Sequence, residues 1–174
     1  MNLWRRMITG VLCLIFLFSL FTPVHAKADD SETAYVDVAV ATLWVEPGIT
    51  RSIDSPSLSN PVDLWTWTKS MSYEEKLWLV GNLETQALYG TKVTILEKQG
   101  DWVKVAVHGQ PTPRHSLGYP GWMPIHQLTK GTAFSQFQSK PFAQIIKPTA
   151  WLYHDPNSRK RFMEISFATR LPVI

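Results

Sequence analysis

Short runs of apolar residues separated by turn residues dominate the chain from about residue 34 onward. Tyr35–Leu43 alternates in part between apolar and polar positions, which places its valines on one face of an extended run. Lys92–Leu96 and Trp102–Val107 are two further short runs rich in Val and Ile. Gly100 lies in the turn between them, as expected for an antiparallel hairpin. The pattern therefore predicts an all-β fold with many turns.

One helix is predicted among these strands. Ser72 is followed three residues later by Glu75, and this spacing is that of a capping box at a helix N-terminus. Apolar residues follow within Leu77–Val80, and Gly81 with Asn82 then supplies an end signal. The helix is therefore expected over a few turns after Ser72.

The chain contains a degenerate internal repeat. Residues 41–47 (ATLWVEP) match residues 150–156 (AWLYHDP) in the pattern A-x-L-aromatic-x-acid-P. Residues 89–96 match residues 167–174 in the same order along the chain. The first copy is longer between its two motifs, and this extra stretch holds the predicted helix. We therefore predict two related β modules, the first with an insertion at about 48–88.

The two copies differ in length after the second motif. The first copy continues to Leu128 through a hairpin and the segment Gly-Tyr-Pro-Gly-Trp, whereas the second stops at Ile174 on an apolar strand. A module of about 40 residues seldom folds alone when no cysteine or evident metal site stabilises it. The prediction is a first module over residues 34–131 and a truncated second module over residues 134–174.

Residues 1–26 have the pattern of a secretory signal peptide. Arg5 and Arg6 precede the apolar run Met7–Phe21, and Val24–Ala26 offers a cleavage site. The apolar run is short for a bilayer span of about 20 residues. An uncleaved N-terminal anchor is the alternative. We expect a secreted protein without membrane contact after cleavage.

Cysteine content and net charge exclude several kinds of functional site. The single cysteine, Cys13, lies inside the apolar run, so cleavage leaves no thiol for a disulfide, a metal or a nucleophile. Removing Arg5 and Arg6 lowers Lys+Arg from 17 to 15 against 14 acidic residues, which leaves the chain nearly neutral. The basic cluster Arg159–Arg161 is too small for a nucleic-acid face, and the histidines lack the spacing of a metal pair. We expect no nucleic-acid partner, no metal and no cofactor.

Four motifs together resemble the bacterial SH3 domain. They are A-x-L-W-x-x-P, Y-G-T-x-V-x-I-L, D-W-x-K-V and G-Y-x-G-W, which begin at residues 41, 89, 101 and 118. The helix-containing insertion and the second copy narrow the resemblance to the N-terminal region of the YkfC-like γ-D-glutamyl-L-diamino acid endopeptidases. That region has two SH3 domains ahead of an NlpC-type cysteine peptidase domain. The resemblance covers residues 34–174 and implies one SH3-like barrel followed by an incomplete second barrel, secreted to the cell wall.

The resemblance also implies a ligand. The catalytic Cys and His of the family lie in a C-terminal domain that this sequence does not include, so no catalytic residue is assigned here. In the first SH3 domain of the family, a glutamate and a tyrosine meet the free amino group of an L-Ala-γ-D-Glu stem peptide. By their places in the motifs, these residues correspond to Glu84 and Tyr119. The implied partners are this peptidoglycan stem peptide and an NlpC-type catalytic domain encoded downstream.

Simpler interpretations remain open for these residues. Glu84 is alternatively an ordinary solvated acid, and Tyr119 alternatively packs on Trp122. The aromatic residues of the insertion either form a stacking surface or hold the insertion against the barrel, and the second interpretation is preferred; they are Trp65, Trp67, Tyr73 and Trp78. For the whole chain we expect the substrate-gating and wall-binding region of a secreted stem-peptide endopeptidase. The alternative is a stand-alone peptidoglycan-binding or protein-interaction module.

Overall fold

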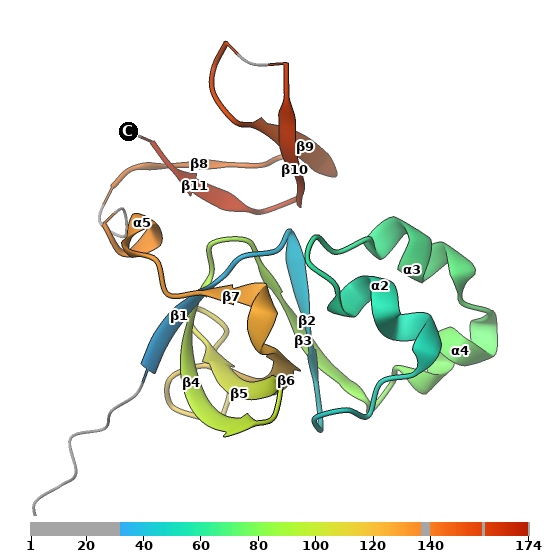
Figure 1. Cartoon of the computed structure of the whole chain (residues 1–174). Coiled ribbons are helices and arrows are strands. Elements are labelled where there is room, and N and C mark those ends of the chain that lie inside the picture. Colours follow the sequence, from blue (N-terminus) through green and yellow to red (C-terminus); the bar gives the residue numbers. More distant parts are fainter. Residues whose placement is uncertain (1–31, 137–139, 158, 174) are drawn as a thin grey trace, which may run out of the picture. The chain divides into compact units, whose positions relative to one another are not determined.

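The computed structural model describes residues 32–136, 140–157 and 159–173 (Figure 1). Within these ranges, the first module forms one antiparallel sheet with the strand order β3-β2-β6-β5-β4-β1-β7. Its strands are β1 (Glu32–Val36), β2 (Val40–Trp44), β3 (Leu83–Leu88), β4 (Lys92–Gln99), β5 (Trp102–Val107), β6 (Tyr119–Pro124) and β7 (Leu128–Thr129). The predicted all-β, SH3-like fold is confirmed. The predicted signal peptide over residues 1–26 lies outside the described residues.

Branched aliphatic side chains from these strands build the main core. On β5, Val103, Val105 and Val107 are fully buried, and they pack with residues from β1, β2, β4 and β6. Burying one such side chain is worth about 1.5–3 kcal/mol relative to leaving it in water. The β4–β5 hairpin turns at Gly100 as predicted, with a left-handed φ of 57° there.

The run Tyr35–Leu43 forms two strands rather than one. β1 ends at Val36 and pairs with β4 and β7, whereas β2 begins at Val40 and pairs with β3 and β6. The backbone N–H of Asp37 donates to the carbonyl of Gln127 over 2.8 Å where the chain bends. The bend keeps the buried valines of this run in the protein interior while the chain passes to another part of the sheet. Alternation alone does not predict this break.

The insertion contains four short helical elements within residues 52–78. The predicted helix is α4 (Tyr73–Trp78), and its capping box is confirmed. The backbone N–H of Ser72 donates to the Glu75 carboxylate over 2.7 Å, and the Glu75 N–H donates to the Ser72 hydroxyl over 3.2 Å. Three further helical elements were not predicted: η1 (Ser52–Asp54), α2 (Ser55–Leu58) and α3 (Leu64–Ser70). Residues 83–88, which we assigned to the insertion, form β3 and pair with β2.

A second apolar cluster joins the insertion to the sheet. Trp67 is 2% exposed, and its ring centroid lies 6.3 Å from that of Trp44 on β2. Trp78 also packs on Trp44, with the two ring centroids 6.4 Å apart. The preferred role of the aromatic residues, holding the insertion in place, is confirmed for these two. Trp65 and Tyr73 are instead 64% and 75% exposed and do not take part.

The second module repeats the strand pairing of the first. Its strands are β8 (Phe142–Gln144), β9 (Thr149–Tyr153), β10 (Arg161–Ser166) and β11 (Arg170–Pro172). β9 pairs with β10 as β2 pairs with β3, and β8 pairs with β11 as β1 pairs with β4. The short helix α5 (Thr132–Ser135) lies between the modules in sequence.

Register and backbone conformation support the repeat at single-residue level. Ala41 faces Ala87 in the first module, and Ala150 faces Ile165 at the matching position of the second. Both pairs of strands also carry an irregularity at corresponding places. The turn residue Gly90 has a φ of 76°, and its counterpart Ala168 adopts a φ of 65° although it carries a Cβ. The predicted internal repeat is thus confirmed.

We expect amide hydrogen exchange to be at least about tenfold slower in β4 than in β10. β4 has a partner strand on each side, β1 and β5, whereas β10 pairs only with β9 among the described residues. Isolated two-stranded pairs are marginally stable in water. Hydrogen exchange followed by NMR measures the two strands in one sample. Protection in Arg161–Ser166 equal to that in Val93–Leu96 would contradict the expectation.

Candidate ligand-binding site

Tyr119 is the first residue of β6, and it faces Val107 of β5 across the sheet. Gly118 before it has a φ of 138°, and a Cβ there would lie 2.0 Å from the carbonyl oxygen of Val107. Only glycine therefore allows the chain to enter β6 in this way. This local requirement explains the first glycine of the G-Y-x-G-W motif and sets the position of the tyrosine.

Glu84 lies near the start of β3, the strand that follows the helical insertion. Its side chain is only 11% exposed. A Cβ at Gly121 of β6 would lie 2.8 Å from the Cβ of Leu43 and 3.4 Å from that of Glu84. The second glycine of the motif therefore lets β6 lie close to the strands that carry Glu84 and Leu43.

Arg114 connects the two predicted residues. Its Nη1 and Nη2 donate to the two carboxylate oxygens of Glu84, the second over 2.7 Å. Nη1 also lies 3.4 Å from the hydroxyl oxygen of Tyr119, and the guanidinium carbon lies 5.4 Å from the centre of the Tyr119 ring. The structure thus brings Glu84 and Tyr119 together at one cation.

This arrangement sets the charge of the glutamate. Hydrogen bonding from Arg114 is the main cause that lowers the pKa of Glu84, and it outweighs burial, which acts to raise it. The charge of Arg114, the Tyr119 hydroxyl and the charge of Lys104 lower it further. The contacts with Glu84 and Tyr119 raise the pKa of Arg114. At neutral pH the site therefore presents a largely covered carboxylate that already binds a cation.

The simpler interpretation of Glu84 as a solvated acid does not agree with this geometry, because the side chain is mostly covered and paired. Arg114 is the residue that sequence reasoning missed. It lies in the loop between β5 and β6, thirty residues from Glu84 in sequence, and no motif marks it. The sequence gives only an indirect indication of its role, because Arg114 lies four residues before the G-Y-x-G-W motif.

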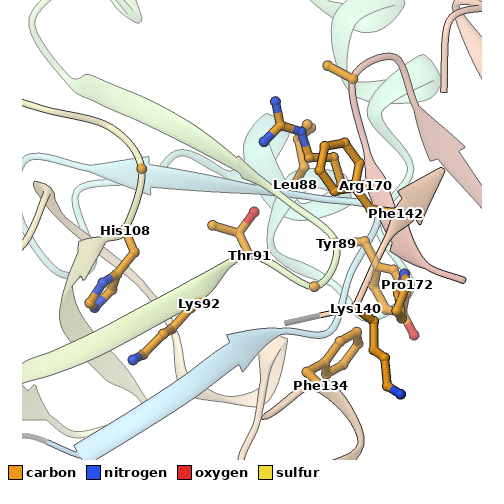
Figure 2. Close-up of a pocket in the computed structure, with 13 residues that line it drawn as sticks. Leu88, Tyr89, Thr91, Lys92, His108, Phe134, Lys140, Phe142, Arg170 and Pro172 are labelled. Atoms are coloured by element: carbon orange, nitrogen blue, oxygen red, sulfur yellow. The ribbon is translucent and has the colours of Figure 1, made fainter. Parts of the chain in front are cut away.

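Figure 2 shows a different hollow of about 440 Å³, which contains neither Glu84 nor Tyr119. Phe134 lies at its wall, with its ring stacked 5.4 Å from that of Tyr35 and edge-on 5.3 Å from that of Tyr89. A Cβ at Gly90 would lie 3.0 Å from the Phe134 ring. These contacts show that Tyr35 and Tyr89 both pack on Phe134.

His108 and His126 have hydrogen-bond partners within the protein. The Nε2 atom of His108 lies 2.8 Å from the Thr94 hydroxyl, and that of His126 lies 2.8 Å from the carbonyl of Leu58. Among the described residues, no group of three or more His, Cys, Asp or Glu side chains could hold a metal ion. No helix in the described part of the chain is long and apolar enough to cross a membrane.

The chain is similar to known proteins along most of its length. The domain family described as the YKFC SH3b2 domain matches residues 145–174. A gamma-D-glutamyl-L-lysine dipeptidyl-peptidase of Bacillus cereus (strain ATCC 10987 / NRS 248) is 51% identical over 172 residues, which is 98% of this chain and 52% of the relative. The resemblance to the SH3 region of YkfC-like peptidases is confirmed. A second YkfC-like relative, a gamma-D-glutamyl-L-lysine dipeptidyl-peptidase of Bacillus subtilis (strain 168), is 37% identical over 138 residues, or 78% of this chain and 45% of the relative.

A solved structure supports the same relationship. An NlpC/P60 family protein from Bacillus cereus ATCC 10987 superposes with a TM-score of 0.78 at 55% sequence identity, over 82% of this chain and 47% of that chain. The chain thus spans about half the length of the curated relatives that it matches.

Proposed function

We propose that this chain is the substrate-gating and wall-binding SH3 region of a secreted peptidoglycan stem-peptide endopeptidase. In this proposal Glu84 and Tyr119 bind the free α-ammonium of an N-terminal L-Ala in L-Ala-γ-D-Glu peptides. The bond that is cut, between γ-D-Glu and the diamino acid, would be cut by an NlpC-type domain. Secretion through residues 1–26 to the cell wall is part of the same proposal.

One observation carries the proposal. The covered carboxylate of Glu84 and the hydroxyl of Tyr119 meet at a single cation, the Arg114 guanidinium. A carboxylate that is 11% exposed and carries a lowered pKa offers a strong, charge-assisted contact to a primary ammonium. A tyrosine hydroxyl beside it supplies a second acceptor. The names of both curated relatives refer to γ-D-glutamyl peptides, which supports this class of ligand.

The test uses the chain joined to the remaining half of the Bacillus cereus relative. Glu84→Gln keeps the size of the side chain and removes the charge, and Tyr119→Phe keeps the ring and removes the hydroxyl. Losing a hydrogen bond to a charged group costs about 1.5–3 kcal/mol, so kcat/KM for a free-amine stem peptide should fall roughly ten- to hundredfold. Steady-state kinetics with L-Ala-γ-D-Glu-L-Lys measures the effect.

Two controls separate recognition from folding. Glu97→Gln removes the charge of a glutamate on β4 and should leave kcat/KM unchanged. An N-acetylated peptide lacks the ammonium, so the unmutated protein should cut it poorly and Glu84→Gln should change that rate little. The thermal midpoint of both site variants should stay near that of the unmutated protein. Free-amine peptide cut at the unmutated rate by both variants would refute the proposal.

A further inference from the structure

Arg114 is the outer partner of the Glu84 carboxylate. The Arg114 side chain is 49% exposed, whereas that of Glu84 is 11% exposed. Both carboxylate oxygens accept from the guanidinium, so the exposed side of the pair is the arginine. A cation that reaches Glu84 from solvent therefore meets an occupied carboxylate.

The loop that carries Arg114 is anchored near Glu84 but leaves the guanidinium able to move. Gln110 donates through Nε2 to the carbonyl of Gln86 over 2.8 Å and accepts from the Thr85 hydroxyl over 2.8 Å. These bonds hold the start of the loop on β3. The backbone N–H of Arg114 donates to the Thr112 hydroxyl over 3.2 Å within the loop. A long arginine side chain can turn away from Glu84 by rotating about its own bonds, without moving this anchor.

We propose that Arg114 is a specificity-determining residue of this site, whose guanidinium occupies the place on Glu84 that a ligand ammonium takes and is displaced as the ligand binds. The inference rests on the proposed function. Exchange of one cation for another keeps the covered carboxylate paired throughout. A covered carboxylate without a partner would be costly. A neutral ligand cannot complete the exchange, so Arg114 makes the site select for a charged primary amine.

The expected size of the effect follows from the exposure of the pair. Ion pairs with a half-exposed partner contribute little, so their loss changes an equilibrium constant by at most about fivefold. Replacing Arg114 by glutamine removes the competing cation and its repulsion of the ligand. The Kd for a free-amine ligand should therefore fall in Arg114→Gln, by more than about twofold and by up to about fivefold.

The experiment titrates the purified chain with the dipeptide L-Ala-γ-D-Glu and follows amide shifts by NMR. Four proteins are compared: the unmutated chain, Arg114→Gln, Glu84→Gln and Lys104→Gln. Lys104 is the matched control, because its charge acts on Glu84 without a hydrogen bond to it, and its loss changes the net charge equally. We expect tighter binding for Arg114→Gln, less than about a twofold change for Lys104→Gln, and loss of binding for Glu84→Gln.

A second readout reports on the ion pair without any ligand. The charged and titratable groups that act on Glu84 are Arg114, Tyr119 and Lys104. The Glu84 carboxyl carbon, followed by NMR against pH, should titrate at a higher pKa in Arg114→Gln than in the unmutated chain. This titration reports whether the ion pair forms in solution, and the ligand titration reports whether the pair competes with the ligand.

The outcomes separate the two hypotheses. Glu84-dependent binding that is equal or weaker in Arg114→Gln overturns the role of Arg114 and leaves the proposed function intact. An unchanged Glu84 titration in Arg114→Gln also overturns it, because the ion pair is then not formed in solution. Absence of Glu84-dependent binding in both the unmutated chain and Arg114→Gln refutes the proposed function and this inference with it.

Discussion

Replacing Asp54 by alanine should lower the free energy of unfolding by about 3 kcal/mol or more. Asp54 is fully buried in the insertion and accepts hydrogen bonds from the Arg51 side chain, over 2.9 and 3.0 Å, and from the Trp67 indole over 2.9 Å. Arg51 in turn donates to the carbonyl of Glu75 over 2.8 Å and lies 4.0 Å from the centre of the Trp78 ring. Removing the carboxylate leaves the arginine and the indole without their shared acceptor.

Asp63→Ala is the matched control in the same insertion. Asp63 is exposed and caps α3 by accepting from the backbone N–H of Thr66 over 2.9 Å, so its loss should cost about 1 kcal/mol. Chemical denaturation with a tryptophan fluorescence readout measures both variants. Equal losses for Asp54→Ala and Asp63→Ala would show that the buried carboxylate does not hold the insertion together.

The same carboxylate should make stability depend on acid. Burial acts to raise the pKa of Asp54, but the hydrogen bonds from Arg51 and Trp67 together outweigh it, so the net shift is below the ordinary 3.8. A lowered pKa contributes stability that is present above 3.8 and is lost as the pH falls through the folded-state value. The unmutated chain should therefore lose stability below about pH 4 more steeply than Asp54→Ala.

Gly118→Ala should be the second large effect, lowering the free energy of unfolding by on the order of 3 kcal/mol. The added methyl would meet the Val107 carbonyl oxygen at 2.0 Å, and the φ of 138° is itself unfavourable for alanine. The clash with Val107 is relieved only if the β5–β6 pairing opens there, and this opening would displace Tyr119. Denaturation gives the energy, and amide exchange at Val107 and Tyr119 reports where the pairing opens.

Gly109→Ala is the control that tests an unfavourable backbone φ without a steric clash. Gly109 has a φ of 81° in the same loop, and a Cβ there would have no atom within 4 Å. Its cost should be about 1 kcal/mol, the ordinary cost of a left-handed residue with a side chain. Equal effects of the two substitutions would mean that the close approach at Gly118 is relaxed without cost.

Features that depend on neighbours in sequence were predicted well. The capping box of α4 joins residues three apart, and the β4–β5 hairpin needs only a turn glycine between two apolar runs. The internal repeat was also visible, because corresponding strands keep the same pattern of apolar, aromatic and turn residues. Family resemblance then placed Glu84 and Tyr119 as candidates, and their role in binding stays a prediction.

Features that depend on distant partners were not predictable. Trp65 and Trp67 are two residues apart on α3, yet one is exposed and the other is buried against Trp44. Helical geometry points them in different directions, but only the position of Asp54 and of β2 decides which one faces inward.

The sequence by itself therefore determined the β class, the repeat, the hairpin and the capped helix, since each rests on local propensity and spacing. Only the tertiary structure decided that Arg114 lies on Glu84 and beside Tyr119. Glu84 lies on β3 and Tyr119 on β6, and both strands pair with β2 in the sheet. The loop that carries Arg114 is held on β3 by a hydrogen bond from Gln110. An ion pair between residues thirty apart in sequence has no local signal, because strand pairing and loop closure create it.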